Sequence, residues 1–390
     1  MEPVTHFLTG ACLGRAGLNR KTALATLTLT LAAEAPDLDV LSRFRGPAFA
    51  FAHHRGFTHS FLGVPIDAAA VVGFVYLIWR LRGRKLKNPN LPPRWGLLFL
   101  YACLAGLSHI LLDFTNNYGV RPFWPFSEKW YSWDIVFIFE PVMFVLLLLG
   151  LIAPSLFALI DKEIGVPQRG PRGRLAATVA LLAVVFMWAV RDFEHRRAVN
   201  ALQSRTYQGA DPLRASAYPS LSNPFRWYGV VETSNFFALA PVDSLTPEVD
   251  PGDAAGGAAE DKLTIFYKPE ETPITLAAKR SYLGRVYLDW AQYPITQTVP
   301  LGLVEQGSPA QDALEQDSPT PDSPAQGYIV NFQDLRFLQL PSLLTRGRRN
   351  ESSGPLGAGV QLDRNLHVVG DVYGSGAKRI TVPEPRQPAN

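Results

Sequence analysis

The chain has little cysteine and little net charge, and both shortages narrow what it can be. Cys12 and Cys103 are the only cysteines among 390 residues, which excludes a disulfide framework and a thiolate metal site. The net charge is only +3, so we expect no nucleic-acid partner, because displacing counterions from phosphates needs a clustered basic face. With 47% apolar and 18% charged residues, the chain is not a disordered polyelectrolyte. Any metal must be bound through nitrogen and oxygen.

Long apolar runs are concentrated before Val190. A helix needs about 20 apolar residues to cross the hydrocarbon core of a bilayer, and four runs approach or exceed that length. We therefore expect an α-helical membrane bundle in the N-terminal half. The four runs are Leu62–Trp79, Leu97–Leu112, Ile135–Ile160 and Leu175–Val190.

The charges between these runs predict their orientation. The segments that follow the first and third runs are rich in Lys and Arg, whereas 113–134 has only Arg121 and Lys129 and many aromatic residues. By the positive-inside rule, the two basic loops face the cytoplasm and 113–134 faces outward. The basic residues are Arg80, Arg82, Arg84, Lys85, Lys87 and Arg94 in one loop, and Lys162, Arg169, Arg172 and Arg174 in the other.

Two shorter apolar stretches, Val4–Gly14 and Thr22–Ala33, predict a helical hairpin at the N-terminus. This hairpin would bring His6 and Glu34 to the outer level of the membrane at its two open ends. We do not expect a cleaved signal peptide, because no basic segment precedes the first apolar stretch. The tip of the hairpin, which would face the cytoplasm, contains Arg15, Arg20 and Lys21.

The composition changes after Val190, where short segments rich in aromatic and β-branched residues alternate with Pro and Gly. Such segments are typical of strands. We therefore divide the chain into a helical transmembrane domain, 1–190, and a β-rich soluble domain outside the cytoplasm, 191–390. Within the second, 243–261 and 305–326 are predicted to be long mobile loops. The predicted strands are Arg226–Glu232, Leu263–Lys268, Arg285–Trp290 and Tyr328–Phe332.

Histidines cluster in the most membrane-like part of the chain. Ionisable groups are costly at membrane depth unless they are paired or line a watered cavity, so such a cluster indicates a functional site. Acidic residues share this region, and histidine together with carboxylate suits a divalent metal. The histidines are His6, His53, His54, His59 and His109, five of the seven in the chain; the acids are Glu34, Asp37, Asp39, Asp67, Asp113, Asp134 and Glu140.

Three local patterns indicate how these groups could meet. His109 and Asp113 are four residues apart on a predicted helix and therefore share one face, as metal ligands or as a hydrogen-bonded pair. Gly56 allows a turn between His54 and His59. In Pro36-Asp37-Leu38-Asp39 the proline ends the preceding helix where two carboxylates begin, which suits metal binding, a general base or a solvated turn.

Other polar residues keep two interpretations each. Glu140 could ligate a metal, or it could pair with Arg55 or be hydrogen-bonded near Pro141. Asp67 has the same two interpretations, and Asp134 or Glu140 could complete the metal shell. Arg55 could orient a ligand or hold a substrate phosphate, because a guanidinium offers a fork of donors.

Several of these motifs together resemble one bacterial family, the YdjM-like, LexA-regulated, membrane-bound metal-dependent hydrolases. The resemblance covers about residues 1–145, and it implies an integral protein of the bacterial cytoplasmic membrane with hydrolase activity. In the C-terminal region, Asp289-Trp290 and Asp334-Leu335-Arg336 are similar to sequence segments of the longer family members. The matching segments are Thr5–Leu8 with His6, Pro36–Asp39, His54–Ser60, Ser108–Asp113, Tyr118–Val120 and Pro122–Pro125.

The order of these motifs is also similar to the zinc-dependent phospholipase C and single-strand nuclease class. The later His and HxxxE ligands of that class have no counterpart after Asp113, where only His195 and His367 follow. We therefore expect one or two divalent ions, with Zn²⁺ favoured, rather than three. The resemblance selects His54 over His53, and the expected metal ligands are His6, Asp37, His54, His59, His109 and Asp113.

We expect a metal-dependent hydrolase with its site at the outer leaflet. The metal would acidify a water molecule and stabilise charge on an ester or phosphoester. Asp39 or Glu34 would act as general base or orient a histidine, with Arg55 as the third catalytic candidate. Membrane lipid is the expected partner, and a lipid-linked molecule the expected substrate.

Two alternatives use the same residues differently. In a transporter the intramembrane histidines and carboxylates would form a transit site for ions, although we find too few spans and no inverted repeat. In the other alternative the β-rich domain binds envelope partners, and the metal only stabilises its membrane anchor.

Overall fold

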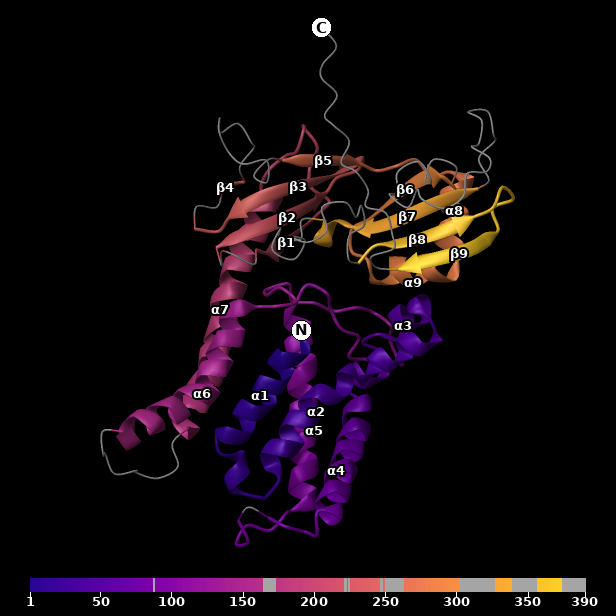
Figure 1. Cartoon of the computed structure of the whole chain (residues 1–390). Helices are drawn as coiled ribbons and strands as arrows, with labels where there is room; N and C mark the ends of the chain where they lie inside the picture. The colour runs from indigo at the N-terminus through magenta and orange to yellow at the C-terminus, as the bar shows by residue number, and fades with distance from the viewer. Residues whose placement is uncertain are drawn as a thin grey trace, which may run out of the picture.

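A computed structural model describes residues 1–86, 88–163, 173–220, 223, 225–245, 248–249, 263–301, 327–338 and 356–373. Helices make up the N-terminal part, and two antiparallel sheets with short helices lie above it in Figure 1. This arrangement confirms the expected fold class, a helical membrane region followed by a β-rich region.

Helices α1 (Pro3–Arg15) and α2 (Ala25–Glu34) form the predicted hairpin, joined through the short 3₁₀ helix η1 (Leu18–Arg20). Gly10 and Gly14, one turn apart on α1, allow the two backbones to approach closely. A Cβ at Gly10 would lie 2.6 Å from the Leu29 carbonyl oxygen, and one at Gly14 would lie 2.8 Å from the Thr26 hydroxyl. Small residues therefore position α1, which carries His6.

Four further helices are long and apolar enough to cross a membrane, as the four runs predicted. The third begins at Pro141 instead of Ile135, because the Ile135 and Val136 N–H groups bond to the Thr115 carbonyl and hold this segment extended. The helices are α4 (Gly63–Leu81), α5 (Trp95–Thr115), α6 (Pro141–Glu163) and α7 (Arg174–Gln203).

The basic ends of these elements gather at one end of the bundle. The Arg174 guanidinium donates to the Ala16 carbonyl at 3.1 Å, and the Ala23 N–H donates to Pro92 O beyond α4. The hairpin tip, the described residues between α4 and α5 and the start of α7 therefore lie together, away from the sheets (Figure 1).

Three short elements cross the opposite end. They are the 3₁₀ helix η2 (Ala35–Arg45), helix α3 (Pro47–His53) and the 3₁₀ helix η3 (Phe57–His59). Helix α2 ends at Glu34, immediately before Ala35-Pro36, as the proline predicted. The turn expected at Gly56 is also present, because α3 stops at His53 and η3 starts at Phe57.

The C-terminal region contains two antiparallel sheets. The first has the order β1-β2-β3-β4 with β5 also on β3, and the second has the order β6-β7-β8-β9. Helices α8 (Pro273–Arg280) and α9 (Tyr282–Trp290) accompany the second sheet. The strands are β1 (Arg214–Pro219), β2 (Arg226–Glu232), β3 (Phe236–Asp243), β4 (Glu248–Val249), β5 (Thr264–Tyr267), β6 (Pro294–Pro300), β7 (Tyr328–Asp334), β8 (Ala358–Leu362) and β9 (Val368–Tyr373).

Three of the four predicted strands are confirmed, but Arg285–Trp290 is a helix. Ser281 caps α9 by accepting from the Gly284 N–H, and Leu283, Tyr287 and Trp290 are buried at helical spacing. Of the predicted loops, 305–326 lies outside the described residues, as does 250–261. The part that is described includes Glu248–Val249, which pairs with β3 as strand β4.

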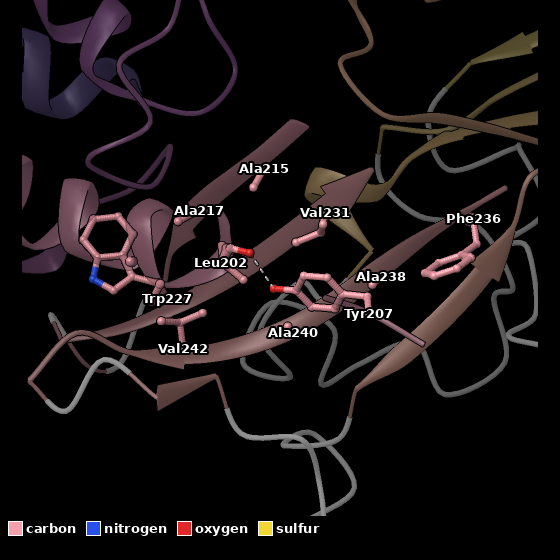
Figure 2. Packing of buried hydrophobic residues seen from close by; sticks show 12 residues of the cluster. Leu202, Tyr207, Ala215, Ala217, Trp227, Val231, Phe236, Ala238, Ala240 and Val242 are labelled. Carbon is pink, nitrogen blue, oxygen red and sulfur yellow. Dashed lines mark hydrogen bonds between the residues drawn. The ribbon is translucent and has the colours of Figure 1, made fainter. Parts of the chain in front are cut away.

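Two cores connect the helices to the sheets. The last turns of α7 pack on the first sheet, where Leu202 lies among Trp227 and Val231 and accepts a hydrogen bond from Tyr207 (Figure 2). A second core joins Phe51 of α3 and Tyr118 to Trp290 and the second sheet. The C-terminal region is thus packed directly onto the elements that cross the end of the bundle.

Candidate metal centre

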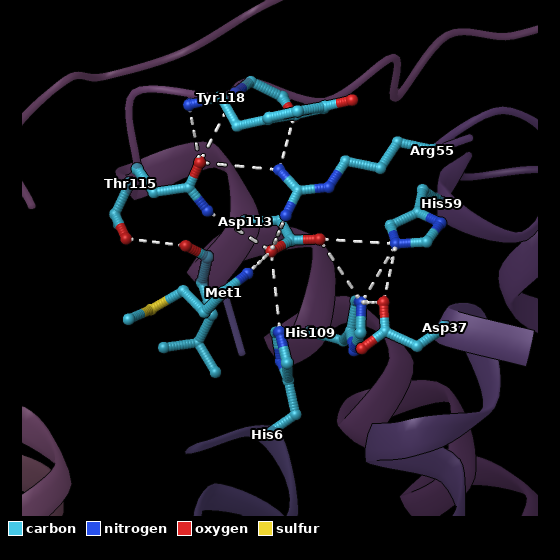
Figure 3. A network of polar contacts seen from close by, with 12 residues as sticks. Met1, His6, Asp37, Arg55, His59, His109, Asp113, Thr115 and Tyr118 are labelled. Atoms are coloured by element: carbon cyan, nitrogen blue, oxygen red, sulfur yellow. Dashed lines mark hydrogen bonds and ion pairs between the residues drawn. The ribbon is translucent and has the colours of Figure 1, made fainter. Parts of the chain in front are cut away.

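Four side chains from three separate segments meet at the end of the bundle that η2, α3 and η3 cross. One ligand atom each of Asp37, His59, His109 and Asp113 lies within 4.8 Å of the others (Figure 3). The two histidine Nε2 atoms are 3.1 Å apart. They lie 3.3 and 3.4 Å from Asp113 Oδ2, and 3.5 and 3.6 Å from Asp37 Oδ1.

Local structure brings each ligand to this point. His109 and Asp113 occupy consecutive turns of α5 on one face, as their spacing predicted. Asp37 enters from η2, directly after the proline that ends α2, and His59 enters from η3. Three of the four residues are fully buried, and Asp37 is partly exposed.

Hydrogen bonds orient the two histidines with Nε2 toward the cluster. His109 Nδ1 lies 2.6 Å from the Ala33 carbonyl, which only accepts, so Nδ1 carries the proton and the Nε2 lone pair is free to bind a metal. His59 Nδ1 lies 3.1 Å from the Thr58 hydroxyl and 3.5 Å from Asp39 Oδ2. Burial lowers the pKa of His59 well below its ordinary value, which favours the neutral form that coordinates metals.

His6 joins the edge of this group. Its ring stacks on His109 with centroids 3.7 Å apart, and its Nε2 is 3.5 Å from Asp113 Oδ1. Both ring nitrogens of His6 are buried without a hydrogen-bond partner among the described residues. His6 is therefore available as a fifth ligand.

Arg55 holds Asp113 from the other side. Its Nη2 donates to Asp113 Oδ1 at 2.8 Å, and its Nη1 donates to the Gly119 carbonyl at 2.6 Å. The guanidinium lies 4.7 Å from the centroid of the Tyr118 ring. The amino group of Met1 also contacts Asp113 (Figure 3). Nη1 also lies 3.4 Å from Asn116 Oδ1, so both Nη atoms of the Arg55 fork are bound within the protein, which is the geometry of a group that orients a ligand.

His54 lies outside the four-residue cluster and, unlike His6, has a hydrogen-bond partner elsewhere. It follows the last residue of α3, and its Nδ1 lies 3.1 and 3.2 Å from the two oxygens of Asp39. The Asp39 carboxylate also accepts from the Arg55 backbone N–H at 2.7 Å. Burial raises the pKa of Asp39, but the hydrogen bond and charge of His54 outweigh it and lower the pKa. An ionised Asp39 thus orients His54, whose side chain is 35% exposed.

The remaining candidates lie in different surroundings. Glu34 is beside Asp37 and the Phe7 backbone. His53 bonds to the Phe49 carbonyl, stacks on that ring and is not among the four clustered residues. Glu140 forms a buried ion pair with Arg191 at 3.0 Å, not with Arg55. Asp134 lies near Ser132 and the charge of Arg336, and Asp67 has one buried oxygen without a partner among the described residues.

The donor set fits a divalent cation. Asp37 Oδ2 and Asp113 Oδ2 are buried without a hydrogen-bond donor within the described ranges, and buried carboxylates without partners are strongly disfavoured. Two imidazole nitrogens and two carboxylate oxygens facing one point are the ligands that borderline divalent metals accept. The hydrogen bonds from outside the cluster fix ligand orientation, as around known metal sites.

The C-terminal region holds the segment that follows Asp113. The Asn116 amide donates to Asp113 Oδ1 at 3.3 Å. Side chains of the C-terminal region bind the backbone carbonyls of the next two residues. Arg336 donates to Asn117 O at 2.9 Å, and the Trp290 indole donates to Tyr118 O at 3.1 Å. The resemblance to longer family members included Asp289-Trp290 and Asp334-Leu335-Arg336 but implied no role for them. The sequence signal that could have indicated a role is the Asp334–Arg336 pair at the end of an apolar strand.

Comparisons with known proteins give a family match over the same region. The model of the family described as YdjM inner membrane protein matches residues 1–196. A Bacillus subtilis (strain 168) protein named uncharacterized protein YfhP is 29% identical over 155 residues, 37% of this chain and 43% of that protein. The match thus spans less than half the length of this relative. No solved structure matches the chain. The family match contains all four residues of the cluster and His6.

Proposed function

Because this chain belongs to the YdjM inner membrane protein family, we propose that it is a metal-dependent hydrolase of that membrane. Its site lies at the outer membrane–water interface and acts on an ester or phosphoester of a lipid-linked substrate. The observation that carries the proposal is the cluster of Asp37, His59, His109 and Asp113. Four potential ligands from three segments, gathered where the spans end, are explained by a shared cation.

The spacing of the ligand atoms supports zinc. Tetrahedral coordination at the usual Zn–N and Zn–O bond lengths of about 2.0–2.1 Å separates neighbouring ligand atoms by about 3.3 Å. The five separations between 3.1 and 3.6 Å described above bracket this value. His6 could complete a five-coordinate arrangement. A divalent ion held there would supply Lewis acidity to the ester and would acidify a water molecule.

The protein's own groups supply proton transfer and orientation. Asp39 holds His54 through Nδ1, so Nε2 of His54 is the atom that accepts or donates a proton at the site. Glu34 is the alternative base, since it lies beside Asp37. Arg55 fixes the Asp113 carboxylate and thereby the direction of its second oxygen.

The position of the charges supports an outward-facing site. The basic hairpin tip, the described basic residues between α4 and α5 and Arg174 lie at the end opposite the cluster, and the positive-inside rule assigns that end to the cytoplasm. The cluster and the C-terminal domain then lie outside the bacterial cytoplasmic membrane. A lipid-linked substrate follows from a site that opens at membrane level.

Metal content and hydrolysis of purified variants test the proposal. His59→Ala and His109→Ala should each lose bound zinc, measured by mass spectrometry, and should lose hydrolysis of lipid phosphoesters. His53→Ala is the matched control, because His53 bonds only to Phe49 among the described contacts, and it should keep both. Zinc retained in both variants would contradict the proposed site. Zinc lost on purification but carried into vesicles would favour the ion-transport alternative.

A further inference from the structure

A cavity of about 760 Å³ lies beside the candidate metal centre and has walls from both parts of the chain. Ligand sites for small molecules commonly have this size. On one side it is lined by Asp37, Asp39, His54 and Arg55. On the other side Leu356 and Tyr373 of the C-terminal region contribute to the wall.

The polar side of the cavity is suited to an anion. Arg43 is exposed there, and the buried Arg55 adds positive charge behind the wall, although both of its Nη atoms donate within the protein. The carboxylate of Asp39 is already occupied by His54 and the Arg55 N–H. Asp37 faces the metal centre. The exposed Arg43 guanidinium and the partly exposed His54 therefore remain for a ligand, with the charge of Arg55 behind them.

The rest of the wall is apolar. Phe51, Ile138 and Leu356 line it, and Tyr373 of β9 stacks on Phe51 with ring centroids 4.4 Å apart. Because these residues come from α3, from the segment before α6 and from the C-terminal region, neither part of the chain forms the cavity alone.

The segment that carries Asp37 and Asp39 also has an apolar face toward the outside. On η2, Leu38 is 60% exposed, Leu41 57% and Phe44 91%. Since η2 crosses the bundle where the spans end, these side chains are placed to enter the lipid interface, with Arg43 and Arg45 beside them. The cavity thus opens next to a lipid-facing element.

We propose that this cavity binds an anionic amphiphile that comes from the membrane. Its phosphate contacts Arg43 and His54, and its hydrocarbon chain lies against Phe51, Ile138 and Leu356. The C-terminal domain therefore selects the substrate by forming one wall of its site. This inference rests on the proposed hydrolase function, because it places the ester beside the metal centre.

Binding of a non-hydrolysable probe tests the cavity without turnover. We would titrate the full chain in nanodiscs with dodecylphosphonate and, separately, with methylphosphonate, and subtract empty nanodiscs. Dodecylphosphonate should bind at least tenfold more tightly. Equal affinities would overturn the proposal, because they would indicate an anion site without a place for a chain.

Two substitutions on one helix provide a matched pair. Ala50 lines this cavity, whereas Ala52 lines a neighbouring one, and both are half-buried on α3. Ala50→Trp should weaken dodecylphosphonate binding at least tenfold with zinc content unchanged, and Ala52→Trp should change it less than twofold. The reverse order would refute the assignment.

Should Ala50→Trp fail to fold, the exposed Arg43 gives a second test. Arg43→Gln should weaken binding of both phosphonates severalfold, and unchanged affinity for both would count against the phosphate contact. Selective binding without any hydrolysis would support the cavity site and contradict the proposed reaction. Hydrolysis without cavity-dependent binding would support the reaction and contradict the cavity site.

Discussion

The contact between Arg336 and the segment after Asp113 gives the sharpest prediction. The Arg336 side chain is 1% exposed and pairs with Asp334 at 2.9 Å. It also donates to the carbonyls of Asn117 and Trp290 at 2.9 and 3.0 Å. Arg336→Met keeps much of the side-chain volume but removes the charge and all of these donors.

The expected loss of stability follows from what is left behind. Asp334 keeps two backbone N–H donors, from Gln292 and Arg336, but loses its cation, and two buried carbonyls lose a donor. Removing one partner of a buried ion pair costs about 3–5 kcal/mol. At about 2–4 °C per kcal/mol, this lowers the unfolding midpoint by roughly 6–20 °C.

Arg336→Met should also weaken zinc binding at the metal centre. Asn117 lies next to Asn116, whose amide binds Asp113, so a loosened segment orients that ligand less well. Loss of groups that orient ligands commonly costs about 10–100-fold in metal affinity, and we expect about tenfold faster zinc loss to a chelator.

Thermal unfolding and zinc release to a chelator measure the two effects. Arg285→Met, at an exposed position of α9, is the control and should shift neither quantity measurably. If Arg336→Met behaves like this control, Arg336 stabilises neither the fold nor the metal centre, and the C-terminal domain does not support the site.

Three further predictions concern other parts of the chain. Glu140→Gln removes the carboxylate that pairs with the buried Arg191, which should cost about 3–5 kcal/mol in chemical denaturation; an unchanged midpoint would contradict it. Gly10→Ala places a Cβ 2.6 Å from the Leu29 carbonyl and should displace α1 from α2, so His6 should lose its contact and zinc affinity should fall, whereas wild-type affinity would refute this packing. Burial raises the pKa of Asp134 to about 6. Because the folded state then binds the proton more tightly, the wild type loses stability as pH rises through that value, and Asp134→Asn should be more stable near pH 7.5 but not near pH 4 in thermal unfolding. A stability gain independent of pH would exclude this cause.

Much of the membrane region could be predicted because its signals are local. Hydropathy adds along a run, so the four long helices and the hairpin followed from composition alone. Pro36 and Gly56 marked where helices end, because each restricts or frees the backbone at its own position. Likewise, the spacing of His109 and Asp113 placed them on one face of α5.

Other assignments depended on information that a short window does not contain. Arg285–Trp290 has the aromatic and branched residues of a strand, but the Ser281 cap and burial against the second sheet make it a helix. His54 was expected to be a metal ligand because the family resemblance selected it over His53. Asp39 instead binds its Nδ1 and turns it toward the cavity.

By itself the sequence determined which segments form long apolar helices and which residue types could bind a metal, since each depends on neighbours within one or two turns. The tertiary structure decided which four of these residues converge and that Arg336 binds the carbonyl of Asn117, 219 positions away. Such contacts depend on how the helices and sheets pack together, and that packing is a property of the whole chain.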